Sequence, residues 1–215
     1  LIFRVLQRIT RIQTIDQVIL ATSTLGRDDV LVQQAQRLGV SWVRGSESNV
    51  ADRYVLAIQE AELDVVIRIP ADNYLTEPWA VEMLIEEHLK FRKGFTTNIM
   101  PILNSGFPDG VGGEAFESSE FLAAHSSDCI SEVDEHVHRH FFDYQPSSYG
   151  LLASGKVRTC LCPSQFAFPE LTFDINTKDQ YLLAFDLYRD LWDDTRFFGI
   201  QDVISWLKSR SNNNC

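Results

Sequence analysis

VVIRIPADNY, residues 65–74, is the stretch that decides the fold of this chain. It opens as a nearly continuous apolar run with β-branched residues, short enough to form a strand that is buried on both faces. Pro70 ends ladder pairing, and the carboxylate of Asp72 follows directly. Ligands bind at the carboxyl ends of strands in an open α/β sheet, so the stretch predicts an acid at a binding edge. The alternative is that Asp72 only caps the turn before the next helix.

The segments before this stretch alternate between helix and strand. Apolar spacing predicts helices at 1–12, 28–38 and 49–61, strands at 17–21 and 40–43, and a further helix at 78–91. This alternation is typical of a parallel, doubly wound sheet. A helix of this kind normally follows a strand, so we expect a first strand before Leu1.

The later segments are less regular. The pattern predicts strands at 95–100, 111–116, 157–162 and 171–173, and helices at 118–124, 131–142, 178–192 and 200–209. No linker separates domains, and 215 residues suit one α/β domain.

Composition limits the function classes. The formal net charge of −11 repels polyanions, so we predict no nucleic-acid surface. No apolar run approaches the roughly 20 residues that span a bilayer, so we predict no membrane segment. The four cysteines lack the paired spacing of a zinc site, and we expect reduced thiols in a cytoplasmic protein.

Two acids stand in similar positions. Asp72 and Asp174 each follow an apolar β run and precede a helix. If their strands adjoin, the two carboxylates converge on one Mg²⁺, which favours one or two carboxylates together with water and substrate phosphates.

The order of short segments is specific. It comprises ATST at 21–24, DD at 28–29, RGS at 44–46, VADRY at 50–54, RIPADN at 68–73, PDG at 108–110 with Glu114, SEVDEHV at 131–137 and FDINTKD at 173–179. In this order the segments resemble the cytidylyltransferases of surface-polysaccharide synthesis, of the spore coat type. That group is related to the acylneuraminate and 3-deoxy-manno-octulosonate cytidylyltransferases.

The resemblance implies a three-layer α/β/α nucleotidyltransferase fold, GT-A or Rossmann-like, with a mostly parallel mixed sheet. Residues 1–100 would be the nucleotide-binding half, 101–175 the sugar-binding and dimer half, and 176–210 the closing helices. The implied reaction transfers CMP from CTP to a sugar or sugar acid with release of pyrophosphate, using Mg²⁺. A homodimer is also implied.

The resemblance assigns roles residue by residue. It gives Asp72, Asp174 and Arg68 to catalysis, with Asp72 and Asp174 as metal ligands. Nucleotide contacts would come from Ala21, Thr22, Ser23, Arg44 and Asp72, and sugar contacts from Asn73, Asp109, Glu114, Glu135 and His136. The alternatives are a solvated surface or an ion pair for Arg44, Arg53 and Arg68, and a solvated turn for Asp109.

Two features depart from the family pattern. The Gly-rich phosphate loop is not in the sequence and should precede Leu1, so we expect this polypeptide, as an N-terminal truncation, to bind CTP poorly and to turn over little or not at all. His136 and His140 lie one helical turn apart, but no zinc motif accompanies them. The open alternatives are a GT-A type glycosyltransferase, for which the Asp-x-Asp motif is missing, and a non-catalytic sugar-nucleotide-binding protein.

Overall fold

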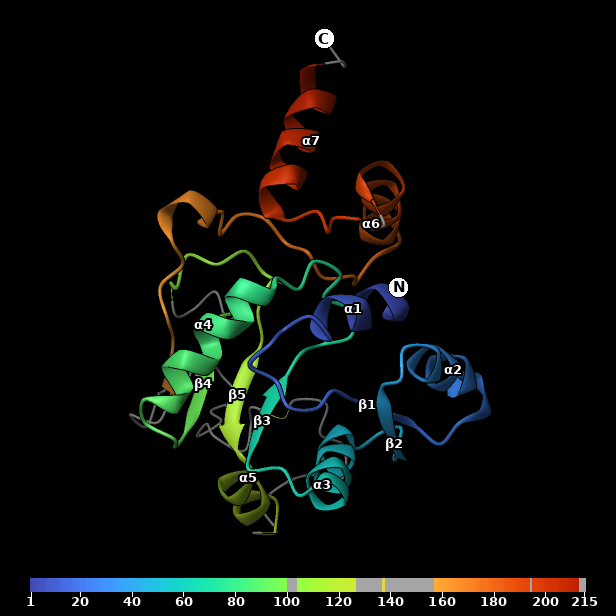
Figure 1. Ribbon diagram of the computed structural model, residues 1–215, viewed down its shortest axis with the longest axis vertical. Helices are drawn as coiled ribbons and strands as arrows, with labels where there is room; N and C mark the ends of the chain where they lie inside the picture. Colours follow the sequence, from blue (N-terminus) through green and yellow to red (C-terminus); the bar gives the residue numbers. More distant parts are fainter. Residues whose placement is uncertain (100–103, 127–136, 138–156, 194, 213–215) are drawn as a thin grey trace, which may run out of the picture.

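The computed structural model describes residues 1–99, 104–126, 137, 157–193 and 195–212 (Figure 1). Helices alternate with strands in the first half of the chain. The elements are α1 (Ile2–Ile9), β1 (Ile19–Ser23), the 3₁₀ turn η1 (Gly26–Asp28), α2 (Asp29–Arg37), β2 (Ser41–Gly45), α3 (Val50–Ala61), β3 (Val65–Arg68), α4 (Pro78–Leu89), β4 (Phe95–Thr97), β5 (Glu114–Glu117), α5 (Ser118–His125), β6 (Val157–Arg158), η4 (Ser164–Phe166), α6 (Lys178–Leu191) and α7 (Ile200–Asn212). The predicted α/β class is confirmed.

Local signals explain several helix ends. The Asn49 side chain accepts a hydrogen bond from the Asp52 amide and caps α3 at its predicted start. A capping box between Thr177 and Gln180 begins α6, and Gly39, with φ of +68°, follows α2. These ends are therefore fixed by residues that the sequence displays.

In the described residues, the strands form a two-stranded and a four-stranded sheet. β1 and β2 pair in parallel, and the second sheet has the order β3-β5-β4-β6. β5 runs antiparallel to both β3 and β4, whereas β4 and β6 are parallel. The sheet is mixed, as predicted. It has more antiparallel pairing than the mostly parallel sheet that the resemblance implied, because β5 runs antiparallel to both of its neighbours.

Three predicted segments need comment. Leu171–Phe173 is not a strand, because its pairing is limited to one bridge between Thr172 and Asp109. The predicted strand 157–162 shrinks to Val157–Arg158. The predicted helix 131–142 lies outside the described residues, apart from position 137.

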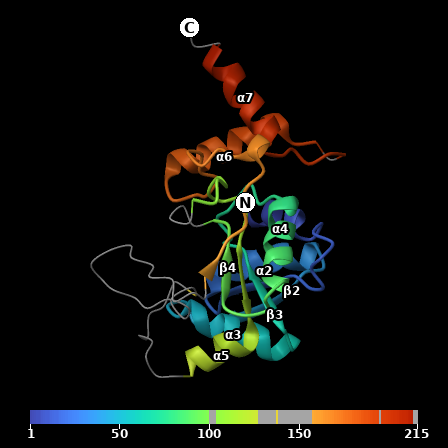
Figure 2. The same ribbon diagram turned by 90° about the vertical axis from the view of Figure 1, so that its left-hand side faces the viewer.

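α6 and α7 stand together at one end of the molecule, and α3 and α5 lie at the other end (Figures 1 and 2). Arg8 of α1 is 1% exposed and connects distant parts of the chain. It donates to the carbonyls of Thr76 and Phe198 at 2.7 and 3.0 Å and lies 3.6 Å from the Glu77 carboxylate. This buried ion pair holds α1, α4 and the start of α7 together. In the described part of the chain, no helix has the length and apolar character needed to cross a bilayer.

Candidate active site

Three segments meet where β3 ends. The Tyr74 amide donates to the Phe173 carbonyl at 3.0 Å, and the Phe173 amide donates to the Asp109 carbonyl at 2.8 Å. The Asp109 amide in turn donates to the Leu171 carbonyl at 3.1 Å. These backbone bonds hold the segments that carry Asp72, Asp109 and Asp174 side by side.

Gly110 makes this close approach possible. Its φ is +81°, and a Cβ built there would lie 2.5 Å from the Phe173 carbonyl carbon and 2.8 Å from the Asp174 amide nitrogen. Any other L-residue would need both a left-handed backbone and more room than the Phe173–Asp174 backbone gives. The Pro-Asp-Gly turn therefore sets the position of Asp174 as well as that of Asp109.

The charges of Asp72 and Asp174 act on Asp109. Burial, then the charge of Asp174, then that of Asp72 raise the pKa of Asp109 above its ordinary value. Burial and the charge of Asp174 also raise the pKa of the Tyr74 hydroxyl. The side chains of Asp72 and Asp174 stay partly exposed. This edge thus concentrates negative charge that solvent and ligands can reach.

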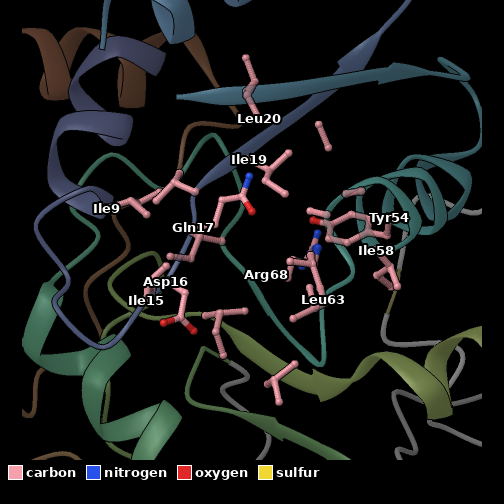
Figure 3. Close-up of a pocket in the computed structure, with 18 of the residues that line it drawn as sticks. Ile9, Ile15, Asp16, Gln17, Ile19, Leu20, Tyr54, Ile58, Leu63 and Arg68 are labelled. Atoms are coloured by element: carbon pink, nitrogen blue, oxygen red, sulfur yellow. The ribbon is translucent and has the colours of Figure 1, made fainter. Parts of the chain in front are cut away.

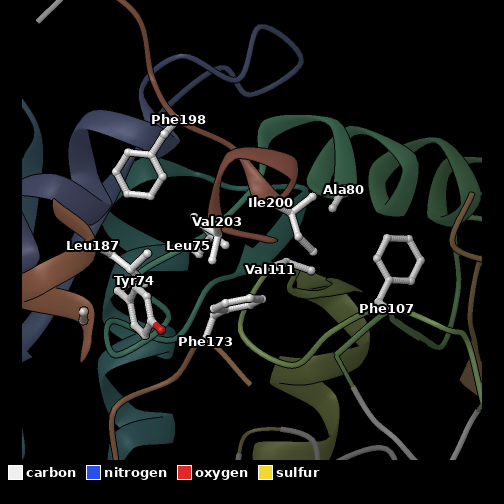
Figure 4. Packing of buried hydrophobic residues seen from close by; sticks show 11 residues of the cluster. Tyr74, Leu75, Ala80, Phe107, Val111, Phe173, Leu187, Phe198, Ile200 and Val203 are labelled. Carbon is white, nitrogen blue, oxygen red and sulfur yellow. The ribbon is translucent and has the colours of Figure 1, made fainter. Parts of the chain in front are cut away.

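A hydrophobic cluster supports the acidic edge (Figure 4). The rings of Tyr74 and Phe173 pack edge to face, with centroids 5.9 Å apart. The Tyr188 hydroxyl of α6 donates to the Tyr74 carbonyl at 2.7 Å. The carboxylates therefore project from backbone that packing and hydrogen bonds hold in place.

The end of β1 has its own network. The hydroxyls of Thr22 and Ser23 both donate to the Asp28 carboxylate, and the Ser23 contact is the shorter. These bonds, that of Ser23 first, lower the pKa of Asp28. Ala21 is half-buried beside them. The resemblance named Ala21, Thr22 and Ser23 as nucleotide contacts. The partnership of the two hydroxyls with Asp28 was not foreseen, although an acid five residues after Ser23 was visible.

Two of the predicted functional arginines have protein partners. Arg44 donates to the carbonyls of Ser23 and Leu25, each at 2.8 Å, and lies 2.7 Å from Asp29. Arg44 thereby holds the loop after β1, in line with the ion-pair alternative.

Arg68 pairs with Glu114 at 2.5 Å, across β3 and β5. Burial opposes the charged form of Arg68, but the Glu114 carboxylate and Tyr54 raise its pKa above the ordinary value. The Glu114 side chain is only 3% exposed. The sequence suggested a ligand for each residue, whereas in the structure each has the other as a partner.

The remaining predicted residues divide into two groups. Asn73 is buried at the turn after β3, and its side-chain nitrogen has no hydrogen-bond partner in the described part of the chain. Glu135 and His136 lie outside the described residues.

An elongated groove of about 870 Å³ leads to this edge (Figure 3). It runs between β1 and β3 and is lined by α1, α3 and α4 as well. Its lining includes Ala71 and Asp72, together with Arg53 and Arg68. The groove between the two sheets therefore reaches the acidic edge at Asp72.

Comparisons with known proteins agree with the resemblance to the cytidylyltransferases. A family model described as cytidylyltransferase matches residues 1–107. The spore coat polysaccharide biosynthesis protein SpsF of Bacillus subtilis is 27% identical over 175 residues, which cover 81% of this chain and 68% of that protein. The uncharacterized protein MJ1063 of Methanocaldococcus jannaschii is 35% identical over 102 residues, or 46% of this chain and 42% of that protein.

Solved structures share the fold. A cytidylyltransferase from Leptospira borgpetersenii aligns with a TM-score of 0.76 at 19% identity, over 98% of this chain and 84% of that one. The 4-diphosphocytidyl-2C-methyl-D-erythritol synthase of Anaerococcus prevotii aligns with a TM-score of 0.58 at 12% identity, over 87% and 85%. The fold is therefore that of the nucleotidyltransferases. The chain belongs to the cytidylyltransferase family, as the family match and the SpsF relative show.

Proposed function

We propose that the acidic edge of Asp72, Asp109 and Asp174 carries the transfer of CMP from CTP to a hydroxyl of a sugar or sugar acid. The family membership favours nucleotidyl transfer over the GT-A glycosyltransferase and the non-catalytic alternatives. The spore coat relative is named for polysaccharide biosynthesis, which supports a sugar acceptor. The observation that carries the proposal is that backbone hydrogen bonds hold the segments of Asp72, Asp109 and Asp174 side by side where β3 ends, with Asp72 lining the groove.

The donor set suits Mg²⁺. Asp72 and Asp174 are accessible carboxylates whose combined charge disfavours ionisation of Asp109, and a divalent cation would offset that repulsion. Among the described residues, no group of three His, Cys, Asp or Glu side chains could hold a metal ion. Asp72 and Asp174 would thus be the protein ligands, while phosphate oxygens and water complete the shell. When bound, the cation neutralises charge on the triphosphate.

The chain's own residues position the reaction. The acceptor oxygen attacks the α-phosphorus, the new P–O bond forms as the bond to the β-phosphate breaks, and pyrophosphate leaves with the electron pair. Burial and two acidic neighbours raise the pKa of Asp109, which supports a role in accepting the hydroxyl proton. Asn73, with an unpartnered buried amide next to Asp72, would orient the acceptor.

The test is magnesium-dependent release of pyrophosphate from CTP by the native protein in the presence of sugar acceptors. Asp72→Asn and Asp174→Asn should each lower turnover at least about a hundredfold with the melting temperature retained, because each removes a charge that acts on the phosphates. Asp179→Asn is the matched control, since Asp179 is an exposed acid in the first turn of α6. Full turnover in both site variants would refute the assignment.

We also propose a homodimer working in the cytoplasm. The dimer is supported by an exposed apolar face on α6, formed by Tyr181, Leu182 and Phe185. The cytoplasmic location is supported by the free thiols of Cys160 and Cys162. Light scattering should give twice the monomer mass, and Phe185→Ser should lower it. Val30→Ser, at another exposed apolar position, should not. A monomeric parent chain would contradict the dimer.

A further inference from the structure

Tyr74 connects the two acidic segments to α6 through its backbone. The Tyr74 amide donates to the Phe173 carbonyl at 3.0 Å, and the Tyr74 carbonyl accepts a hydrogen bond from the Tyr188 hydroxyl at 2.7 Å. Asp72 lies two residues before Tyr74, and Asp174 directly follows Phe173. The backbone of Tyr74 is therefore bonded on one side to the Asp174 segment and on the other side to α6.

α6 completes a closed path of bonds around the acidic edge. The helix begins at Lys178, four residues after Asp174, with the capping box already described. Tyr188 lies ten residues further along the helix, which corresponds to about 15 Å. The chain thus runs from Asp174 through α6 to Tyr188, and the Tyr188 hydroxyl binds the segment that carries Asp72. The two acids are connected through the helix as well as through the backbone bond between Tyr74 and the segment of Asp174.

The surroundings of Tyr188 fix the position of its hydroxyl. Its ring packs edge to face on Phe198, with centroids 5.0 Å apart, and the centroid of the Trp192 ring is 5.8 Å away. Burial raises the pKa of Tyr188, although the charges of Arg8 and Arg4 act in the opposite direction. The hydroxyl therefore stays protonated at neutral pH and acts as a hydrogen-bond donor.

The Tyr74 carbonyl is in a place where water cannot easily substitute for this donor. Tyr74 is 1% exposed, and its ring packs on Phe173 in the hydrophobic cluster that also contains Leu187 of α6 (Figure 4). A buried carbonyl that loses its donor is costly, so the backbone moves toward another partner. Loss of the Tyr188 hydroxyl should therefore shift the backbone at Tyr74.

We propose that Tyr188 is a positioning residue that sets the spacing of Asp72 and Asp174 through the Tyr74 backbone. This inference rests on the proposed function, in which the two carboxylates bind one Mg²⁺. Mg²⁺ demands near-ideal octahedral geometry, so two carboxylates that share it must keep a defined separation. Without the hydroxyl, the segment of Asp72 loses its attachment to α6, whereas Asp174 remains covalently joined to that helix.

The experiment compares the native protein with Tyr188→Phe, which removes the hydroxyl and keeps the ring. Binding of Mn²⁺ in place of Mg²⁺ is measured by water-proton relaxation, without CTP or acceptor. Groups that orient metal ligands typically contribute about 10–100-fold to metal affinity or activity. Because Tyr188 acts through the backbone, we expect the lower end of this range, a rise of about tenfold in the Kd for Mn²⁺. At saturating Mg²⁺, kcat for pyrophosphate release should fall by a similar factor.

Two control variants separate positioning from general effects. Ser205→Ala removes an exposed hydroxyl that donates to the Gln201 carbonyl of α7 at 2.9 Å, and it should change neither the Kd nor kcat. Val203→Ala removes buried volume from the cluster that contains Tyr74 but keeps the Tyr188 hydroxyl. It should lower Tm, with the Kd for Mn²⁺ unchanged at temperatures well below Tm.

The outcomes distinguish the inference from the function on which it rests. Equal Kd and kcat in Tyr188→Phe and the native protein would overturn the inference and leave the proposed metal site intact. An equal rise of the Kd in Val203→Ala would also overturn it, because loosening of the cluster would then be the cause. If the native protein binds no Mn²⁺, or if Asp72→Asn leaves the binding unchanged, the proposed metal site fails and the inference fails with it.

Discussion

Gly110→Ala tests how the acidic edge is positioned. The new Cβ would lie 2.5 Å from the Phe173 carbonyl carbon, whereas carbon atoms in contact are about 3.5–4.0 Å apart. The 173–174 backbone must therefore move by about 1 Å. A misplacement of that size in a catalytic group can cost about a hundredfold in rate. We expect kcat/KM for pyrophosphate release to fall by about that factor.

Two other glycines provide matched controls. Gly39 also has a positive φ, of +68°, but its Cβ would meet nothing within 4 Å. Gly39→Ala should cost about 1–2 kcal/mol of stability from backbone strain alone, or about 2–8 °C in Tm, with activity retained. Gly26→Ala, at a position with ordinary φ and open space, should change neither quantity.

The comparison separates strain from position. Gly110→Ala should lose more Tm than Gly39→Ala and should be the one variant of the three that loses activity. If Gly110→Ala is as active as Gly39→Ala, the Asp109 turn does not position Asp174 for catalysis and the reasoning fails.

Three further predictions concern buried charge. Arg8→Met should lower the free energy of unfolding by about 3–5 kcal/mol in urea titrations, because Glu77 is left buried without its partner. Adding Glu77→Gln should recover part of this loss, and no recovery would contradict the pairing. Arg68→Met should be similarly costly through Glu114, and Glu114→Gln should offset it. Burial lowers the pKa of His88 below 6.5, so the unfolded state takes up the proton first and stability should fall as pH drops below 6.5; His88→Gln should flatten that slope, and an unchanged slope would exclude His88 as its source.

Local sequence signals predicted much of the first half of the fold. Asn49 and Gly39 mark helix ends that the structure confirms, and β1, β2 and β3 lie within two residues of their predicted positions. These elements follow from apolar spacing and capping chemistry, which depend on neighbours in sequence. The family was identified from the resemblance of the short segments to the cytidylyltransferases.

Sequence reasoning failed where long-range pairing decides the structure. Leu171–Phe173 has the composition of a strand but forms one bridge with Asp109, since its backbone is also used by Tyr74. The apolar run of β3 predicted a strand buried on both faces but did not identify its neighbour, which is β5 in the described residues.

Local patterns are enough to predict the α/β class, the order of elements and the acids that end the apolar runs, because each depends on periodicity or on one turn. Which charged side chains become partners depends on how the chain folds back on itself. Arg68 and Glu114 are 46 residues apart, and pairing of β3 with β5 makes them partners. Asp72, Asp109 and Asp174 share one edge because Gly110 lets two loops approach. Such contacts depend on strand register and close packing, which no local pattern in the chain encodes.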